Sequence, residues 1–155
     1  MDGLLDESFN RETDRYLLSV MAPPDGVLAK MEQYALTKKF PFIGPLAGNL
    51  LGVLARATGA QRVFELGSGF GYSALQFARC MPPDGRVICT DGDPENKARA
   101  EKYFADAGMS AKLDFARVTR WRYLRNATDR LTLFSWIWTR KNIRRGFARH
   151  GPRCG

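Results

Sequence analysis

A glycine-rich turn at residues 64–73 constrains the fold more than any other stretch of this chain. It reads Phe-Glu-Leu-Gly-Ser-Gly-Phe-Gly-Tyr-Ser, and a short β-prone run at residues 62–64 leads into it. The turn holds Gly67, Gly69 and Gly71 and is followed by an amphipathic stretch. A strand, a tight glycine turn and a helix start are typical of a βα unit, in which a nucleotide-like ligand lies against the helix N-terminus.

The spacing of the glycines and the acid before them narrow the choice of ligand. The glycines form G-x-G-x-G, so the third comes one position earlier than in the dinucleotide fingerprint G-x-G-x-x-G. Glu65 stands at the expected strand end, where a carboxylate would repel a pyrophosphate but attract an ammonium or sulfonium group. S-adenosylmethionine has both positive groups and no phosphate. A plain turn that only closes a βα unit is the alternative, and Glu65 with Tyr72 and Ser73 favours the cofactor site.

Length and composition indicate one domain. The 155 residues are enough for a hydrophobic core, and no apolar run is long enough to span a membrane. Residues 1–7 are acidic, which argues against a secretory signal. Cys80, Cys89 and Cys154 are an odd number without metal-ligand spacing, which fits a reducing compartment. The apolar neighbours of Cys80 and Cys89 favour buried, inert thiols at those two positions. The sequence therefore predicts a cytoplasmic protein.

The net charge of +8 is unevenly distributed. Residues 1–115 hold 13 Lys and Arg against 15 Asp and Glu, whereas residues 116–155 hold 11 against one. The second segment also contains every Trp and the single His of the sequence. A basic segment with interleaved Trp can bind RNA by neutralising phosphates and stacking on bases, so this break needs its own explanation.

Periodicity and turn signals predict helices first and then an alternation of strands and helices. The predicted helices are 6–20, 25–36, 46–54, 73–80 and 94–107, and the predicted strands start at 62, 86 and 112. The order β-α-β-α-β is the N-terminal half of a doubly wound α/β sheet with preceding helices. Half of such a sheet would leave its first strand with an open edge.

Asp91 is a second candidate for ligand binding. It lies twenty residues beyond Gly71, at the end of the second predicted strand, where an acid can accept hydrogen bonds from two ribose hydroxyls. Its alternative role is to cap the next helix. Asp93 already fits that role because Pro94 follows it at the first helical position, so Asp91 is predicted to be free for a ligand.

Several stretches, in order and at the right spacing, resemble the cation-dependent class I O-methyltransferases, the group of the catechol and caffeoyl-CoA O-methyltransferases. The resemblance covers residues from about 10 to 115, and the matching stretches are 43–45 with Gly48, 65–75, 90–94 and 103–108. It implies a Rossmann-like fold, S-adenosylmethionine, a magnesium-type divalent cation in the intact family, a small hydroxylated or phenolic acceptor and often a homodimer. The positions that match cofactor contacts are Ile43, Glu65, Gly67, Tyr72, Ser73, Asp91 and Gly92.

Residues 116–155 depart from that family. At this point the family has a Gly-Asp-Ala segment and a strand close to Phe-Asp-Leu-Val-Phe-Ile-Asp-x-Asp-Lys. The first Asp of its Asp-x-Asp binds the metal, the Lys helps to deprotonate the acceptor, and a later Asp-Asn pair completes the metal site. Residues 116–155 contain none of these motifs and one acid, Asp129. We therefore predict no catalytic residue and no metal ligand in this chain.

The genetic code suggests that the missing motif is encoded in a different reading frame. In the shifted frame, each codon consists of the last base of one present codon and the first two bases of the next. Trp has the single codon TGG, so the last base of the Trp136 codon and the first two bases of the Ile137 codon must spell Asp. The codons of Trp138 and Thr139 must spell a second Asp in the same way. Between them the code yields Leu or Met. The neighbouring codons permit Phe-Asp-Leu-Val-Phe-Leu before this Asp-x-Asp and Lys-Glu-Glu-Tyr after it. The hypothesis is a frameshift near residues 115–117, natural or from sequencing, with an early stop after the last residue.

The predicted organisation is a partial S-adenosylmethionine-binding domain over residues 1–115 and a basic, frameshifted, poorly ordered tail over residues 116–155. By family the function is methyl transfer to a small hydroxylated acceptor, and this chain is expected to be impaired or inactive. The expected partner is that small molecule, with no membrane and no nucleic acid. Two alternatives stay open: a cofactor-binding remnant without catalysis, and an RNA-binding protein that uses the tail.

Overall fold

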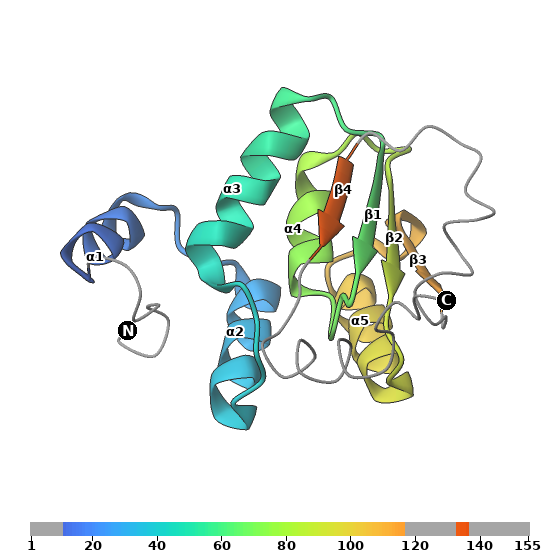
Figure 1. Ribbon diagram of the computed structural model, residues 1–155, viewed down its shortest axis with the longest axis horizontal. Coiled ribbons are helices and arrows are strands. Elements are labelled where there is room, and N and C mark those ends of the chain that lie inside the picture. The colour runs from blue at the N-terminus through green and yellow to red at the C-terminus, as the bar shows by residue number, and fades with distance from the viewer. Residues whose placement is uncertain (1–10, 117–132, 137–155) are drawn as a thin grey trace, which may run out of the picture.

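The computed structural model describes residues 11–116 and 133–136, which form helices around a small sheet (Figure 1). The helices are α1 (Arg11–Val20), α2 (Gly26–Lys38), α3 (Gly44–Ala57), α4 (Tyr72–Cys80) and α5 (Pro94–Asp106), with a 3₁₀ turn η2 (Ser110–Lys112). The strands are β1 (Arg62–Leu66), β2 (Arg86–Thr90), β3 (Leu113–Ala116) and β4 (Leu133–Trp136). The predicted α/β order is confirmed, while residues 6–10 of the first predicted helix and most of residues 116–155 lie outside the described residues.

The strands form one parallel sheet in the order β3-β2-β1-β4. On one side β1 pairs with β2, and on the other it pairs with β4, from Val63↔Leu133 to Leu66↔Trp136. The expectation of an open edge on β1 is therefore wrong, because the backbone of β4 occupies that edge. The prediction failed because the change to a basic composition at residue 116 indicated the end of the fold, so no strand was predicted beyond it. An apolar, β-prone run nevertheless follows that residue.

The helices α4 and α5 cover the same face of the sheet. Each lies in a crossover between parallel strands, and both crossovers run in the same direction across the sheet, from β1 to β2 and from β2 to β3. The helix α4 packs against β2, α5 packs against β3, and α3 lies alongside α4 (Figure 1). The main core lies between this layer and the sheet, and Phe70, Phe77 and Phe104 are among its largest fully buried side chains.

The close contact between α3 and α4 depends on glycine. A Cβ atom at Gly52 would lie 2.8 Å from Sγ of Cys80, and one at Gly48 would lie 3.1 Å from the side chains of Gln76 and Tyr72. Both distances are shorter than ordinary van der Waals contact, so larger residues at these positions would push the helices apart. The glycines of α3 thus set the distance between α3 and α4, and with it the position of the glycine turn that precedes α4.

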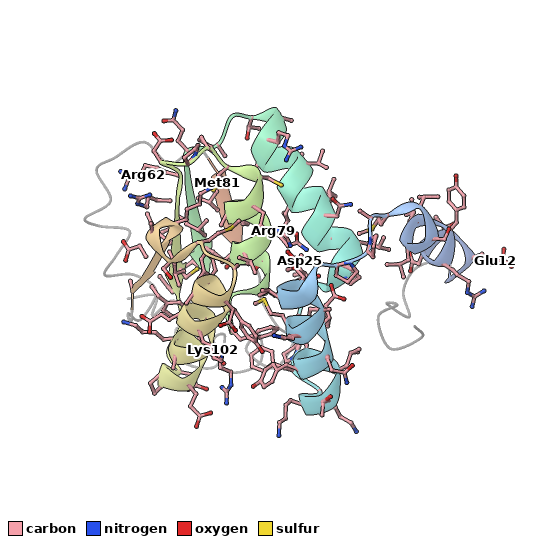
Figure 2. All side chains as sticks on the ribbon, turned by 180° about the vertical axis from the view of Figure 1, so that it is seen from behind. Glu12, Asp25, Arg62, Arg79, Met81 and Lys102 are labelled. Atoms are coloured by element: carbon pink, nitrogen blue, oxygen red, sulfur yellow. The ribbon has the colours of Figure 1, made fainter. Side chains whose placement is uncertain are left out.

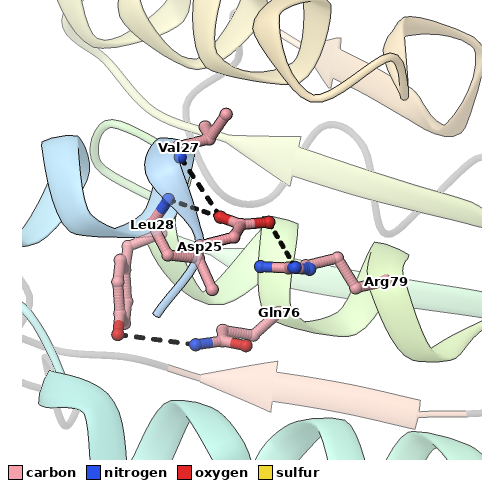
Figure 3. Close-up of polar contacts among 6 residues, drawn as sticks. Asp25, Val27, Leu28, Gln76 and Arg79 are labelled. Atoms are coloured by element: carbon pink, nitrogen blue, oxygen red, sulfur yellow. Dashed lines mark hydrogen bonds and ion pairs between the residues drawn. The ribbon is translucent and has the colours of Figure 1, made fainter. Parts of the chain in front are cut away.

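An ion pair fixes the start of α2 to α4. Asp25 caps α2 by accepting the backbone N–H groups of Val27 and Leu28, at 3.2 and 3.0 Å. Its second carboxylate oxygen faces the guanidinium of Arg79 on α4 (Figures 2 and 3). Burial alone would raise the pKa of Asp25, but the Leu28 N–H and the Arg79 charge outweigh it and lower that pKa.

Candidate functional site

The turn between β1 and α4 requires glycine at three positions. Gly67, Gly69 and Gly71 have φ angles of 73°, 54° and 85°, all in the left-handed region that residues with a Cβ rarely adopt. Gly71 is the N-cap of α4, and a Cβ there would lie 2.9 Å from Cβ of Ala100 on α5. The alternate glycines thus satisfy both the backbone conformation and the close approach of α5.

Hydrogen bonds fix the turn to the end of β2. The backbone N–H groups of Gly67 and Ser68 both donate to the carbonyl oxygen of Thr90, each at 2.9 Å. In return the Thr90 hydroxyl donates to the carbonyl oxygen of Glu65 at 3.0 Å, and the Thr90 N–H donates to Ser68 Oγ at 3.2 Å. The carboxyl ends of β1 and β2 are therefore held together as one unit.

An aromatic cluster holds the same turn from the other side. Phe70, in the turn, is 1 % exposed and packs edge to face on Phe40 and Tyr34, with ring centroids 5.0 and 5.3 Å apart. Tyr103 of α5 lies 6.2 Å from Phe70, centroid to centroid. A Cβ on Gly69 would lie 3.0 Å from the Phe40 ring, so the loop after α2 rests directly on the turn.

Glu65 is a buried carboxylate at the carboxyl end of β1. It is fully buried, the hydroxyl of Ser73 donates to its Oε1, and its Oε2 has no hydrogen-bond partner among the described residues. Burial raises the pKa of Glu65 from its ordinary 4.5 to about 7, against the opposing effect of the nearby Ser73 and Ser68 hydroxyls. A buried acceptor oxygen without a partner is rare and indicates a missing donor.

Asp91 follows β2 and reaches back to the turn. Its Oδ2 accepts the N–H of Gly69 at 3.0 Å, and its Oδ1 accepts the N–H of Asp93 at 2.8 Å and the side-chain amide of Asn96 at 3.3 Å. Asp91 thus connects β2, α5 and the glycine turn through hydrogen bonds within the chain, and its availability to a ligand stays a prediction. The prediction that Asp93 caps α5 is confirmed, since its carboxylate accepts the N–H of Glu95 at 2.9 Å.

The structure brings most of the predicted site residues together at the carboxyl ends of β1 and β2. Open space lies beside Gly92, where a Cβ would have no heavy atom within 4 Å. Ile43 is the N-cap of α3 and packs partly buried against the main core. The residues that gather around the turn are Glu65, Gly67, Ser73, Asp91 and Gly92.

The side chain of Tyr72 is engaged elsewhere. It is 2 % exposed, and its hydroxyl donates to Oε1 of the buried Glu32 on α2 at 2.6 Å. Gln76 donates to the same hydroxyl at 3.4 Å (Figure 3). The Phe42 ring packs edge to face on the Tyr72 ring. The phenol thus connects α4 to α2, which leaves the backbone of Tyr72, at the first position of α4, for any ligand contact.

Asn96 and the aromatic cluster were not predicted from the sequence. Asn96 is 5 % exposed, donates to Asp91 and has an unpaired Oδ1 among the described residues. Its only signal in the sequence is a short polar side chain inside an otherwise regular helix, four residues before Ala100. Aromatic residues such as Phe40 and Phe70 have no periodic relation along the chain, so pattern reasoning did not connect them.

The described residues gather no group of three or more His, Cys, Asp or Glu side chains that could hold a metal ion. They therefore do not fit the divalent cation that the family resemblance implies. None of the helices within residues 11–116 is both long and apolar enough to cross a membrane.

The parallel sheet and its glycine turn define a Rossmann-like class of α/β proteins, and the comparisons with known proteins narrow that class. The sequence model described as O-methyltransferase matches residues 21–138. The chain therefore belongs to the O-methyltransferase family.

Individual relatives agree with this assignment. The catechol O-methyltransferase of Niastella koreensis is 30% identical over 102 residues, which are 64% of this chain and 46% of that protein. Tricin synthase 1 of Oryza sativa subsp. japonica is 39% identical over 66 residues, 43% of this chain and 26% of that enzyme. The chain thus spans less than half the length of these relatives.

Solved structures share the fold. The O-methyltransferase TomG of Streptomyces achromogenes, in complex with SAM, superimposes with a TM-score of 0.72 and 26% identity, over 88% of this chain and 64% of TomG. The O-methyltransferase of Bacillus cereus, in complex with SAH, gives a TM-score of 0.75 at 20% identity, over 88% of this chain and 65% of its own. At that identity the second match supports the fold alone.

Proposed function

We propose that this chain is the cofactor-binding part of an S-adenosylmethionine-dependent O-methyltransferase whose acceptor is a small catechol-like or other phenolic hydroxyl. The cofactor would lie at the carboxyl ends of β1 and β2, against the glycine turn. Its proposed contacts are Ile43, Glu65, Gly67, Tyr72, Ser73, Asp91 and Gly92.

The unpaired oxygen of Glu65 is the observation that carries the proposal. A buried carboxylate beside a glycine turn is unsuitable for a phosphate but suits a ligand with an ammonium and a sulfonium group. Asp91 has about one lone-pair site left after its three hydrogen bonds, which is available for a ribose hydroxyl. The left-handed glycines allow the ligand to approach the backbone closely.

The chemistry that these residues support is binding and orientation. Bound S-adenosylmethionine supplies a methyl group on a positively charged sulfur, which an acceptor oxygen can attack in line. Glu65 would neutralise part of the ligand's charge, and the turn would hold the ligand at a fixed distance from β1 and β2. Among the described residues none is placed as a general base for the acceptor, and no step is derived through a metal ion.

The register of β4 supports the second part of the proposal, that the reading frame is shifted. Leu66 pairs with Trp136, so the Asp codon that spans Trp136 and Ile137 falls at the carboxyl end of β4, beside the end of β1. This is the edge where ligands of parallel sheets bind. We infer that the chain in its present frame binds cofactor without methyl transfer, and that residues 116–155 are a frameshifted segment rather than an RNA-binding extension.

Calorimetric titration with S-adenosylmethionine tests the cofactor site. We expect binding by the chain, and an affinity about tenfold or more lower in Glu65→Gln, because the ionic partner of the ligand is lost. Glu101→Gln is the matched control, since Glu101 is exposed on α5. The absence of binding by the unmutated chain would contradict the proposed function, and equal affinities of the chain and Glu65→Gln would refute the role of Glu65.

A further inference from the structure

Asn96 is a buried polar residue to which the proposed cofactor contacts assign no role. It lies in the first turn of α5, is 5 % exposed, and directs its amide at Oδ1 of Asp91. Its own Oδ1 has no hydrogen-bond partner among the residues that the structure describes. An unpaired buried acceptor destabilises a fold, so its presence indicates a partner that binds there.

The position of Asn96 places it between the end of β2 and the glycine turn. Residues four apart share one face of a helix, so Asn96 lies on the same face as Ala100. Ala100 in turn contacts the turn at Gly71. The amide of Asn96 therefore approaches Asp91 from the side on which α5 meets the turn.

Counting acceptors at this edge shows what Asn96 adds. A carboxylate offers about four lone-pair sites, and Asp91 already accepts three hydrogen bonds, so about one site remains. A ribose has two neighbouring hydroxyl donors. The second acceptor at hand is Oδ1 of Asn96, which is held by the hydrogen bond that its own amide donates to Asp91.

We propose that Asn96 is a positioning and ligand-binding residue. Its Nδ2 fixes the orientation of the Asp91 carboxylate, and its Oδ1 accepts the second hydroxyl of a nucleoside ligand. The inference rests on the proposed function, because it takes the ligand to be the S-adenosyl group. The amide can donate to Asp91 and accept from the ligand at once, whereas an ionised carboxylate at residue 96 would repel Asp91 and an apolar side chain would do neither.

Titration with S-adenosylhomocysteine across pH separates this role from a structural one. We expect Asn96→Asp to bind at least tenfold more weakly than the unmutated chain at pH 8. At pH 5.5 its affinity should return towards that of the chain, because a proton shared by residues 91 and 96 restores the hydrogen bond. Asn49→Asp, which changes an exposed residue of α3 in the same way, should follow the unmutated chain at both pH values.

The other titratable groups near Asp91 are the same in all variants, so the ratio of affinities at each pH isolates residue 96. They are Asp93 at the start of α5, whose N–H donates to Asp91, and Cys89 on β2. Burial raises the pKa of Cys89, and the charges of Glu65 on β1, Asp114 on β3 and Asp91 raise it further. Circular dichroism checks that each variant is folded. Asn96→Ala provides a second test, since its loss of affinity should be the same at both pH values.

A ligand without the ribose diol completes the experiment. The 2′,3′-dideoxy analogue of S-adenosylhomocysteine should bind the unmutated chain and Asn96→Ala with equal affinity. Equal affinity of the chain and Asn96→Asp for S-adenosylhomocysteine at pH 8 would overturn this inference and leave the proposed function intact. If the unmutated chain does not bind S-adenosylhomocysteine, the proposed function and the inference both fail.

Discussion

Glu65 shows how one residue links ligand choice to stability. Burial raises its pKa from 4.5 to about 7, so between these values the folded protein retains a proton that the unfolded chain has released. The unfolded state then binds fewer protons than the folded state, and the free energy of unfolding decreases as pH rises. Burial of this carboxylate thus lowers the stability of the folded protein at neutral pH.

The pH dependence of unfolding in urea measures this cost. Glu65→Gln stays neutral at every pH, so we expect its stability relative to the unmutated chain to increase as pH rises from about 4.5 and to level off above about 7. The expected difference at pH 7.5 is on the order of one to a few kcal/mol. Two parallel stability curves over this range would show that Glu65 does not titrate in the folded protein as described.

At the residue scale the sequence predicted function from local signals and missed contacts between distant segments. Glu65 and the cap at Asp93 were predictable because a strand end and an Asp-Pro pair each have a local meaning. The bond from Gly69 to Asp91 joins residues 22 positions apart, and that from Tyr72 to Glu32 joins residues 40 apart. Neither has a pattern in the sequence, and both changed the interpretation of a predicted site residue.

At the scale of elements, the spacing between α3 and α4 positions the glycine turn. A Cβ at Gly52 would lie 2.8 Å from Sγ of Cys80, so we expect Gly52→Ala to lower the free energy of unfolding by about 1–3 kcal/mol. Chemical unfolding in a double-mutant cycle identifies the cause. With Cys80→Ala the clash is absent, and Gly52→Ala should become neutral or stabilising because alanine favours a helix.

One result of this double-mutant cycle would contradict the role of the Cys80 sulfur atom. If Gly52→Ala costs the same free energy with Cys80 and with Ala at that position, the sulfur atom is not what limits the approach of the helices. The close contact would then depend on the backbone of α4 itself, whose Gln76 carbonyl oxygen lies 3.5 Å from the same Cβ position.

The helices and the first three strands were predictable because their periodicity, caps and turns agree with the fold. The strand β4 was not counted, because the change to a basic composition at residue 116 suggested that the fold ended there. Its pairing with β1 is a tertiary contact between residues 70 positions apart, from Val63↔Leu133 onward. A break in charge is therefore weaker evidence for a boundary than an apolar run is for a strand.

At the scale of the whole molecule, the chain spans about two thirds of the solved relatives and less than half of the curated ones. We predict that DNA sequenced across codons 110–120 contains an insertion or a deletion that shifts the reading frame away from that of the family. A chain expressed in the restored frame should transfer methyl groups to a catechol only with a divalent cation present, whereas the present chain should transfer none. A DNA sequence whose only open frame is the present one, or turnover by the present chain, would contradict this.

The pairing of β4 with β1 has a consequence for the proposed shift of frame. The ladder between two strands is made by backbone groups, which are the same whatever the side chains are. Codons that spell an apolar run in two frames can therefore keep a strand at the edge of the sheet while every side chain on it is exchanged. The proposed shift of frame would remove the reactive carboxylates at once but leave the sheet its fourth strand, so a gene of this kind would lose its chemistry before it loses its architecture.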